Sequence, residues 1–188
     1  MSTREKYAPG AAFGAEVRKG EDKWTLVLVR ALRHPPAKVW DALTDPAQLR
    51  EWAPFDADRN LAAPGTAKLT TAGAPSAPAT DGVVTRVEAP RLLEFTWGGN
   101  EMRWELEPLA SGTRLTLWHN IGRKFVAMGA AGWHICFDVL DHYLAGDPIG
   151  RIVGGDAFKV GGWQRLNAEY AQQFGSDNPT SKNTNSNP

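Results

Sequence analysis

The segment LRHPPAKVWDALTDPAQLREWAP, residues 32–54, predicts two short helices that meet at a kink. Pro35 and Pro36 end the preceding extended segment and fix φ for a first helical turn. Val39, Trp40 and Leu43 then share one face of a helix. This first helix therefore has a buried side but is too short to be stable alone.

A second helix is predicted to start at Asp45, which is followed by Pro46 at the first helical position and by Gln48 three residues on. Leu49 and Trp52 supply its apolar face. Because neither helix buries enough surface to stand alone, the pair is expected to brace a larger element at one end of a sheet.

Strands are predicted on both sides of this segment. Residues 15–32 read as a hairpin, with a turn at 19–22 and a long strand over residues 23–33. Residues 82–120 read as a four-strand antiparallel meander with a polar outer face. Alternation assigns the following residues to its concave face: Val83, Thr85, Val87, Leu93, Phe95, Trp97, Met102, Trp104, Leu106, Leu115, Leu117 and His119.

An amphipathic helix over residues 130–146 is the predicted cover of the concave face. Its apolar side carries Trp133, Cys136, Phe137 and Leu140. A further helix is predicted at about 158–174, followed by a polar low-complexity tail at 175–188 that is expected to be disordered. With a flexible N-terminus over residues 1–14, the chain is predicted to hold one domain, 15–174, whose core is 23–146.

Composition narrows the function classes. Lys plus Arg and Asp plus Glu number 21 each, so no net charge would attract nucleic acid or an anionic membrane. The single cysteine, Cys136, excludes an internal disulfide and fits a reducing compartment. No signal peptide or membrane-spanning segment is evident, so we expect a cytoplasmic protein without a membrane span.

These elements resemble the START-like (SRPBCC) superfamily, in the branch named after the C-terminal domain of the activator of the heat-shock-protein-90 ATPase. The resemblance rests on HPPAKVWDALTDPAQLREW, VEAPRLLEFTWGG, GTRLTLWH and GWHICFDVLDHYLAG. It implies an α+β helix-grip fold, in which a curved antiparallel sheet wraps around a long C-terminal helix. It also implies that the two short helices form a V-shaped cradle for that helix, filled by Trp40 and Trp52.

The same resemblance implies an interior cavity between sheet and long helix, but no shared catalytic set. The residues expected to line the cavity are Phe95, Trp97, Trp104, Leu117, His119, Trp133, Phe137 and Leu140. The family's usual aromatic pair before Gly-Pro is replaced here by Trp52, Ala53 and Pro54, which changes the expected cavity mouth. Plain core packing of the aromatic residues remains the alternative.

Few residues offer catalytic chemistry. His119 points inward by alternation and needs a hydrogen-bond partner, which can be protein, water or ligand. His134, Asp138 and His142 share one helix face. A polar stripe exposed to solvent accounts for this spacing without a bound metal ion. Cys136 lies on the apolar side of the helix, where we expect its thiol to pack as a small, unreactive apolar side chain. We therefore expect no catalytic residue, metal or cofactor.

Three functions remain open from the sequence. The first is non-enzymatic binding of a small hydrophobic or aromatic ligand, with His119 orienting a polar end. The second is an interaction module that stimulates a chaperone ATPase, as the branch name implies. The third is a polyketide-cyclase-like enzyme, which needs a second inward ionisable residue such as Arg86 or Glu94; the pattern places both outward.

Overall fold

The computed structural model describes residues 2–176. Its elements are α1 (Thr3–Lys6), β1 (Ala15–Arg18), β2 (Lys23–Leu32), α2 (Pro36–Thr44), α3 (Pro46–Trp52), β3 (Phe55–Ala57), β4 (Gly65–Thr71), β5 (Thr80–Glu88), β6 (Leu92–Trp97), β7 (Asn100–Leu109), β8 (Gly112–Gly122), η1 (Arg123–Phe125), α4 (Val126–Leu144), α5 (Gly155–Lys159) and α6 (Trp163–Phe174).

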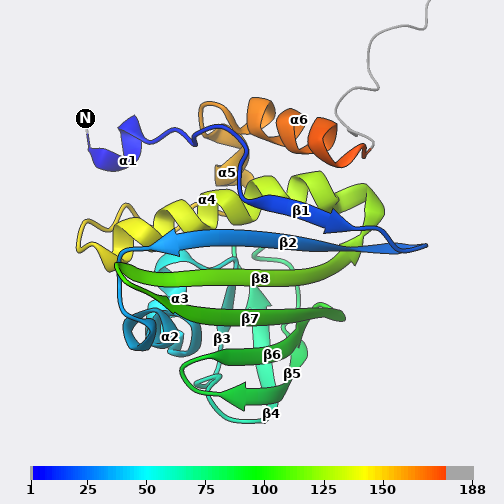
Figure 1. Cartoon of the computed structure of the whole chain (residues 1–188). Coiled ribbons are helices and arrows are strands. Elements are labelled where there is room, and N and C mark those ends of the chain that lie inside the picture. The colour runs from blue at the N-terminus through cyan, green and yellow to red at the C-terminus, as the bar shows by residue number, and fades with distance from the viewer. Residues whose placement is uncertain (1, 177–188) are drawn as a thin grey trace, which may run out of the picture.

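One curved antiparallel sheet forms the body of the molecule, with strand order β1-β2-β8-β7-β6-β5-β4-β3. Helix α4 lies along the sheet, and α6 packs on the side of α4 that faces away from the sheet (Figure 1). Helices α2 and α3 contact each other and α4. This arrangement confirms the predicted α+β helix-grip fold. No helix in residues 2–176 is long and apolar enough to cross a membrane.

The two short helices form where the prolines and Asp45 predict them. The Asp45 carboxylate caps α3 by accepting a hydrogen bond from the amide of Ala47 at 2.9 Å. Trp52 is fully buried, and its indole N–H donates to the carbonyl oxygen of Ala42 in α2 at 2.9 Å. This bond joins the two helices across their kink.

Strand β5 differs from the simple alternation predicted for it. Val84 points inward and is 2% exposed, whereas Val83 is 42% exposed and Thr85 is also exposed. The register shifts between Val84 and Arg86, so Val87 returns to the core side. The assignment of Val83 and Thr85 to the concave face was therefore wrong, because the irregularity reverses the phase partway along the strand.

The N-terminal residues pack on the helical layer. The Tyr7 hydroxyl donates to the Asp138 carboxylate at 2.7 Å, and the Tyr170 hydroxyl donates to the carbonyl of Phe13 at 3.2 Å. The sequence predicts a flexible segment here, because small and turn-prone residues carry no periodic signal. In the structure residues 2–14 make specific contacts with α4 and α6. Of the predicted disordered tail, 175–188, residues 177–188 lie outside the described residues.

Candidate ligand cavity

A cavity of about 340 Å³ opens at one end of the interface between the sheet and α4. It lies beside the turn that joins β6 to β7, at the end of β8 and along the first half of α4. Its lining residues are Pro54, Trp97, Asn100, His119, Ile121, Gly122, Phe125, Met128, Gly129, Gly132, Trp133, Cys136, Ile152, Val153, Gly154 and Ala157. None of them is an Asp, Glu, Lys or Arg, so the walls are mainly apolar.

His119 and two tryptophans form the aromatic wall of the cavity. The Trp97 and His119 rings stack with centroids 6.0 Å apart, and the Trp133 ring meets His119 edge-on at 5.9 Å. The Trp133 indole N–H donates to His119 Nδ1 at 3.0 Å. This bond makes Nδ1 an acceptor, so the imidazole hydrogen is carried by Nε2.

His119 is held in its neutral form. Burial, together with the positive charge of Lys23, lowers the pKa of His119 to about 4. Its Nε2 atom is buried and has no hydrogen-bond partner within the described part of the chain. His119, a residue of the cavity wall, thus keeps a neutral imidazole whose one unused donor, on Nε2, is covered by the surrounding atoms in this structure.

Two glycines keep the α4 wall of the cavity thin. A Cβ atom placed on Gly132 would have no neighbouring heavy atom within 4 Å, whereas one on Gly129 would lie 2.7 Å from Cδ1 of Ile121. A glycine inside a helix costs about 0.5–1 kcal/mol relative to alanine. At Gly132 the missing side chain leaves open space beside the helix.

The third wall comes from the segment between α4 and α5. Arg151 donates to the Asp56 carboxylate at 2.6 Å. The Arg4 guanidinium donates to the carbonyls of Ile149 and Gly150 at 3.0 and 2.9 Å. These contacts hold Ile152 and Val153 at the cavity.

Replacing Arg151 with methionine is expected to speed amide hydrogen exchange in residues 148–156 about tenfold, because the ion pair to Asp56 is lost. Hydrogen exchange read by mass spectrometry measures this change. The matched control is Arg114→Met, which removes an exposed ion pair with Glu107 and should leave the segment unchanged. Equal exchange in both variants would contradict the role given to Arg151.

The structure brings together only some of the residues that the sequence assigns to the cavity. Trp97, His119 and Trp133 line it. The others, Phe95, Trp104, Leu117, Phe137 and Leu140, are buried in the centre of the interface and do not line this cavity. Their side chains fill the middle of the space between sheet and helix, so the open part lies at its end.

Sequence reasoning missed the remaining walls. Gly129 and Gly132 lie in the first half of α4, which begins at Val126, four residues before its predicted start, so that Gly129 fell outside the predicted helix. Two glycines inside an apolar helix were a usable signal, since they lower helix stability without an obvious local reason. Ile152 and Val153 follow no strand or helix period and gave no signal.

Two residues of the predicted solvated stripe, His134 and Asp138, are covered, whereas the side chain of the third, His142, is 35% exposed. His134 is 1% exposed, and its Nδ1 lies 2.8 Å from the hydroxyl of Tyr170 on α6. Asp138 accepts from Arg30 at 2.5 Å. The sequence pattern could not show this, because α6 and the N-terminal residues cover the stripe from far along the chain. No three His, Cys, Asp or Glu residues in the described part are placed to hold a metal ion.

Cys136 lies in the cavity wall as a buried free thiol. Burial raises the pKa of Cys136 to about 12. The thiol therefore stays protonated at neutral pH and acts as apolar surface.

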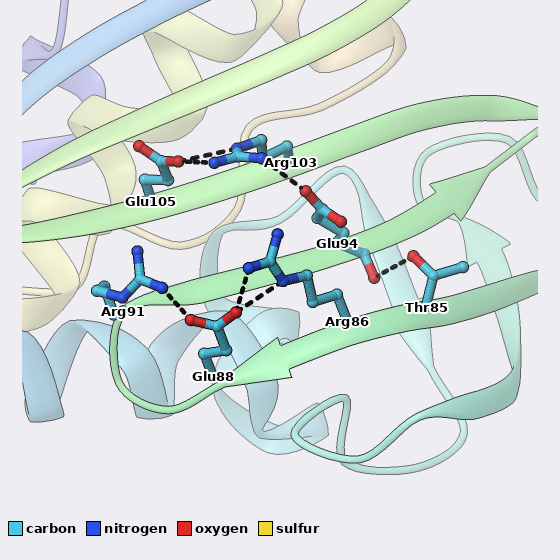
Figure 2. A network of polar contacts seen from close by, with 7 residues as sticks. All are labelled: Thr85, Arg86, Glu88, Arg91, Glu94, Arg103 and Glu105. Atoms are coloured by element: carbon cyan, nitrogen blue, oxygen red, sulfur yellow. Dashed lines mark hydrogen bonds and ion pairs between the residues drawn. The ribbon is translucent and has the colours of Figure 1, made fainter.

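The outer face of the sheet carries a network of paired charges (Figure 2). Arg103 donates to Glu94 at 2.9 Å and also pairs with Glu105. Glu88 pairs with Arg86 and with Arg91. Arg86 and Glu94 thus lie on the opposite face of the sheet from His119. A larger groove of about 490 Å³ on this face is polar and includes Arg103 and Glu94 among its walls.

Comparison with known proteins identifies relatives of this architecture. A family model described as activator of Hsp90 ATPase homolog 1-like protein matches residues 33–145. No protein with a curated description is similar enough in sequence to count as a relative. The cavity walls supplied by Ile152, Val153 and Ala157 lie beyond the matched range.

Solved structures share the fold at low sequence identity. CalU16 from Micromonospora echinospora is 21% identical, with 88% of this chain and 98% of that chain covered and a TM-score of 0.60. A conserved protein of unknown function from Enterococcus faecalis is 17% identical, with 85% and 89% covered and a TM-score of 0.65. DynU16, a putative protein in the dynemicin biosynthetic locus, is 23% identical, with 72% and 52% covered and a TM-score of 0.61.

Proposed function

The chain belongs to the family of activator of Hsp90 ATPase homolog 1-like proteins, and from this premise and its cavity we propose that it binds a small hydrophobic molecule. The observation that carries the proposal is the composition of the walls, which combine apolar surface with one unsatisfied buried donor on His119. A mostly apolar pocket with a few fixed polar groups is the usual form of a small-molecule site.

The size of the cavity supports the proposal. Its volume of about 340 Å³ falls within the range of ligand pockets, about 300–1,000 Å³. CalU16 and DynU16 share the fold, and DynU16 comes from a biosynthetic locus. A small product or intermediate of biosynthesis is therefore one class of ligand that we propose for this chain.

The first test compares the mass of the purified protein under native and denaturing conditions. Surplus native mass that disappears on unfolding supports the proposal and begins the identification of the ligand. Equal masses would be followed by titration with apolar aromatic probes. Failure of all such probes to bind would overturn the proposal and favour an interaction module, which acts through its surface.

Filling the cavity from α4 is expected to weaken ligand binding without unfolding the protein. Gly132→Leu places a side chain into open space, so ligand affinity should fall at least about tenfold. The free energy of unfolding should not decrease, because a helical glycine is removed. Isothermal titration and urea unfolding measure the two quantities.

The matched control for this variant is Gly161→Leu. Gly161 is exposed, a Cβ atom there meets nothing within 4 Å, and the residue does not line the cavity. This variant should bind with unchanged affinity. A ligand that binds Gly132→Leu as tightly as the original protein would place its site elsewhere and contradict the proposal.

The paired charges of the outer face offer little support for docking through charge. Arg103 and Arg86 are each engaged by a carboxylate of the same sheet. A partner that bound there through its own charges would have to compete with these contacts. Arg103→Gln removes the ion pairs with Glu94 and Glu105 on the face opposite the cavity and should leave ligand affinity unchanged, which separates the cavity from this surface.

A further inference from the structure

We infer that the ligand is an uncharged, flat molecule with a carbonyl group, as in a ketone, quinone or ester, whose oxygen accepts a hydrogen bond from Nε2 of His119. This inference rests on the proposed function and goes further, because it assigns the polar contact and the charge class of the ligand.

The donor role of Nε2 follows from the geometry at the other ring nitrogen. Trp133 donates to Nδ1, so the neutral imidazole carries its hydrogen on Nε2. A buried donor without a partner is unfavourable, and a small shift of the imidazole at the cavity wall would let a ligand acceptor remove this cost. A ligand with only donors, or with no polar atom, would leave the cost in place.

The charge class follows from the rest of the walls. Among the lining residues there is no Asp, Glu, Lys or Arg to neutralise an ionised ligand. The positive charge that acts on His119 is that of Lys23, whose ammonium group donates to the side-chain oxygen of Asn100 at 3.1 Å. A carboxylate would lose its hydration in an apolar cavity without gaining an ion pair inside it, which is unfavourable.

The shape class follows from the helix surface and the aromatic rings that line the cavity, of which Trp133 belongs to α4, like the two glycines, and Trp97 to β6. Gly129 and Gly132 offer helix surface without side chains, and Trp97 and Trp133 offer aromatic rings. Aromatic rings favour stacked or edge-on contact with other rings. A flat ligand can use both surfaces and still place a carbonyl near the imidazole.

Three matched naphthalenes test the inference: 2-acetylnaphthalene, which has a neutral acceptor; 2-ethylnaphthalene, which has none; and 2-naphthoate, which is charged. Isothermal titration at pH 7 is expected to give about tenfold tighter binding for the ketone than for the hydrocarbon. The carboxylate is expected to bind more weakly than the hydrocarbon.

His119→Asn provides the decisive variant. The asparagine oxygen can still accept from Trp133, but the donor at the position of Nε2 is lost. In this variant the ketone should then bind no better than the hydrocarbon, so that the preference for the ketone is lost. Equal affinities of ketone and hydrocarbon for the original protein would overturn the inference while leaving the proposed function intact.

A spectroscopic measurement keeps the inference testable if the variant does not fold. The carbonyl stretch of bound 2-acetylnaphthalene should move to lower frequency than in cyclohexane, because the carbonyl accepts a hydrogen bond. An unchanged frequency would overturn the inference. If none of the three naphthalenes binds, the proposed function fails together with the inference.

Discussion

Replacing Trp104 with alanine is expected to lower the free energy of unfolding by about 3–5 kcal/mol. The side chain is 1% exposed and meets Trp52 edge-on at 6.1 Å and Trp133 at 5.4 Å, measured between ring centroids. Its removal leaves a cavity where the cradle helix α3 meets the sheet. Urea unfolding at pH 7 measures the change.

The matched variant is Trp97→Ala. Trp97 lines the ligand cavity and is only partly buried, so its loss should cost less stability and more ligand affinity than the loss of Trp104. The sequence predicts Trp104 as a cavity wall, whereas the structure places it in the core and not among the residues that line the cavity. Folded Trp104→Ala protein that loses affinity with little loss of stability would contradict the placement of Trp104 in the core.

The fold was predictable where local chemistry determines the backbone. Prolines at 35, 36 and 46 and the cap at Asp45 identify α2 and α3, because these residues act within one helical turn. Alternation likewise identifies the strands of the meander. It failed at β5, because the register shift between Val84 and Arg86 changes the phase of alternation without a clear mark in composition.

The cavity was less predictable, because its position depends on which side chains fill the interior. Alternation shows that Trp97, Trp104 and Phe95 point inward, but it does not show which of them meet other rings. In the structure the ring of Phe95 packs on that of Phe55, with centroids 5.8 Å apart. Phe55 belongs to the short strand β3, for which the sequence showed no strong pattern. The open volume therefore lies at the end where Gly129 and Gly132 face the sheet.

His119 alone is expected to make the protein about 3 kcal/mol less stable at pH 4 than at pH 7. Its pKa is about 4 in the folded protein and close to the ordinary value of 6.5 in the unfolded chain. Between these values the unfolded chain binds the proton and the folded protein does not. The stability is therefore fully present above pH 6.5 and is lost as the pH falls toward 4.

The cause of this loss is structural. Burial disfavours the charged imidazolium, and the positive charge of Lys23 acts in the same direction. A proton on Nδ1 would also face the indole N–H of Trp133, which now donates to that atom at 3.0 Å. Protonation thus replaces a hydrogen bond by two opposed donors inside the aromatic wall.

His119→Asn isolates this contribution from the other groups that titrate over the same range. Burial lowers the pKa of His134 as well, and the pKa of Glu169 is lowered by its hydrogen bond from the Ala12 amide, so the total loss of stability includes several contributions.

Asparagine at position 119 does not titrate and can still accept from Trp133. Urea unfolding between pH 4 and 8 should therefore show a variant that depends less steeply on pH than the original protein. The difference between their free energies of unfolding should change by about 3 kcal/mol across this range. Parallel curves would show that His119 does not stay neutral in the folded protein, and the donor assigned to Nε2 would lose its basis.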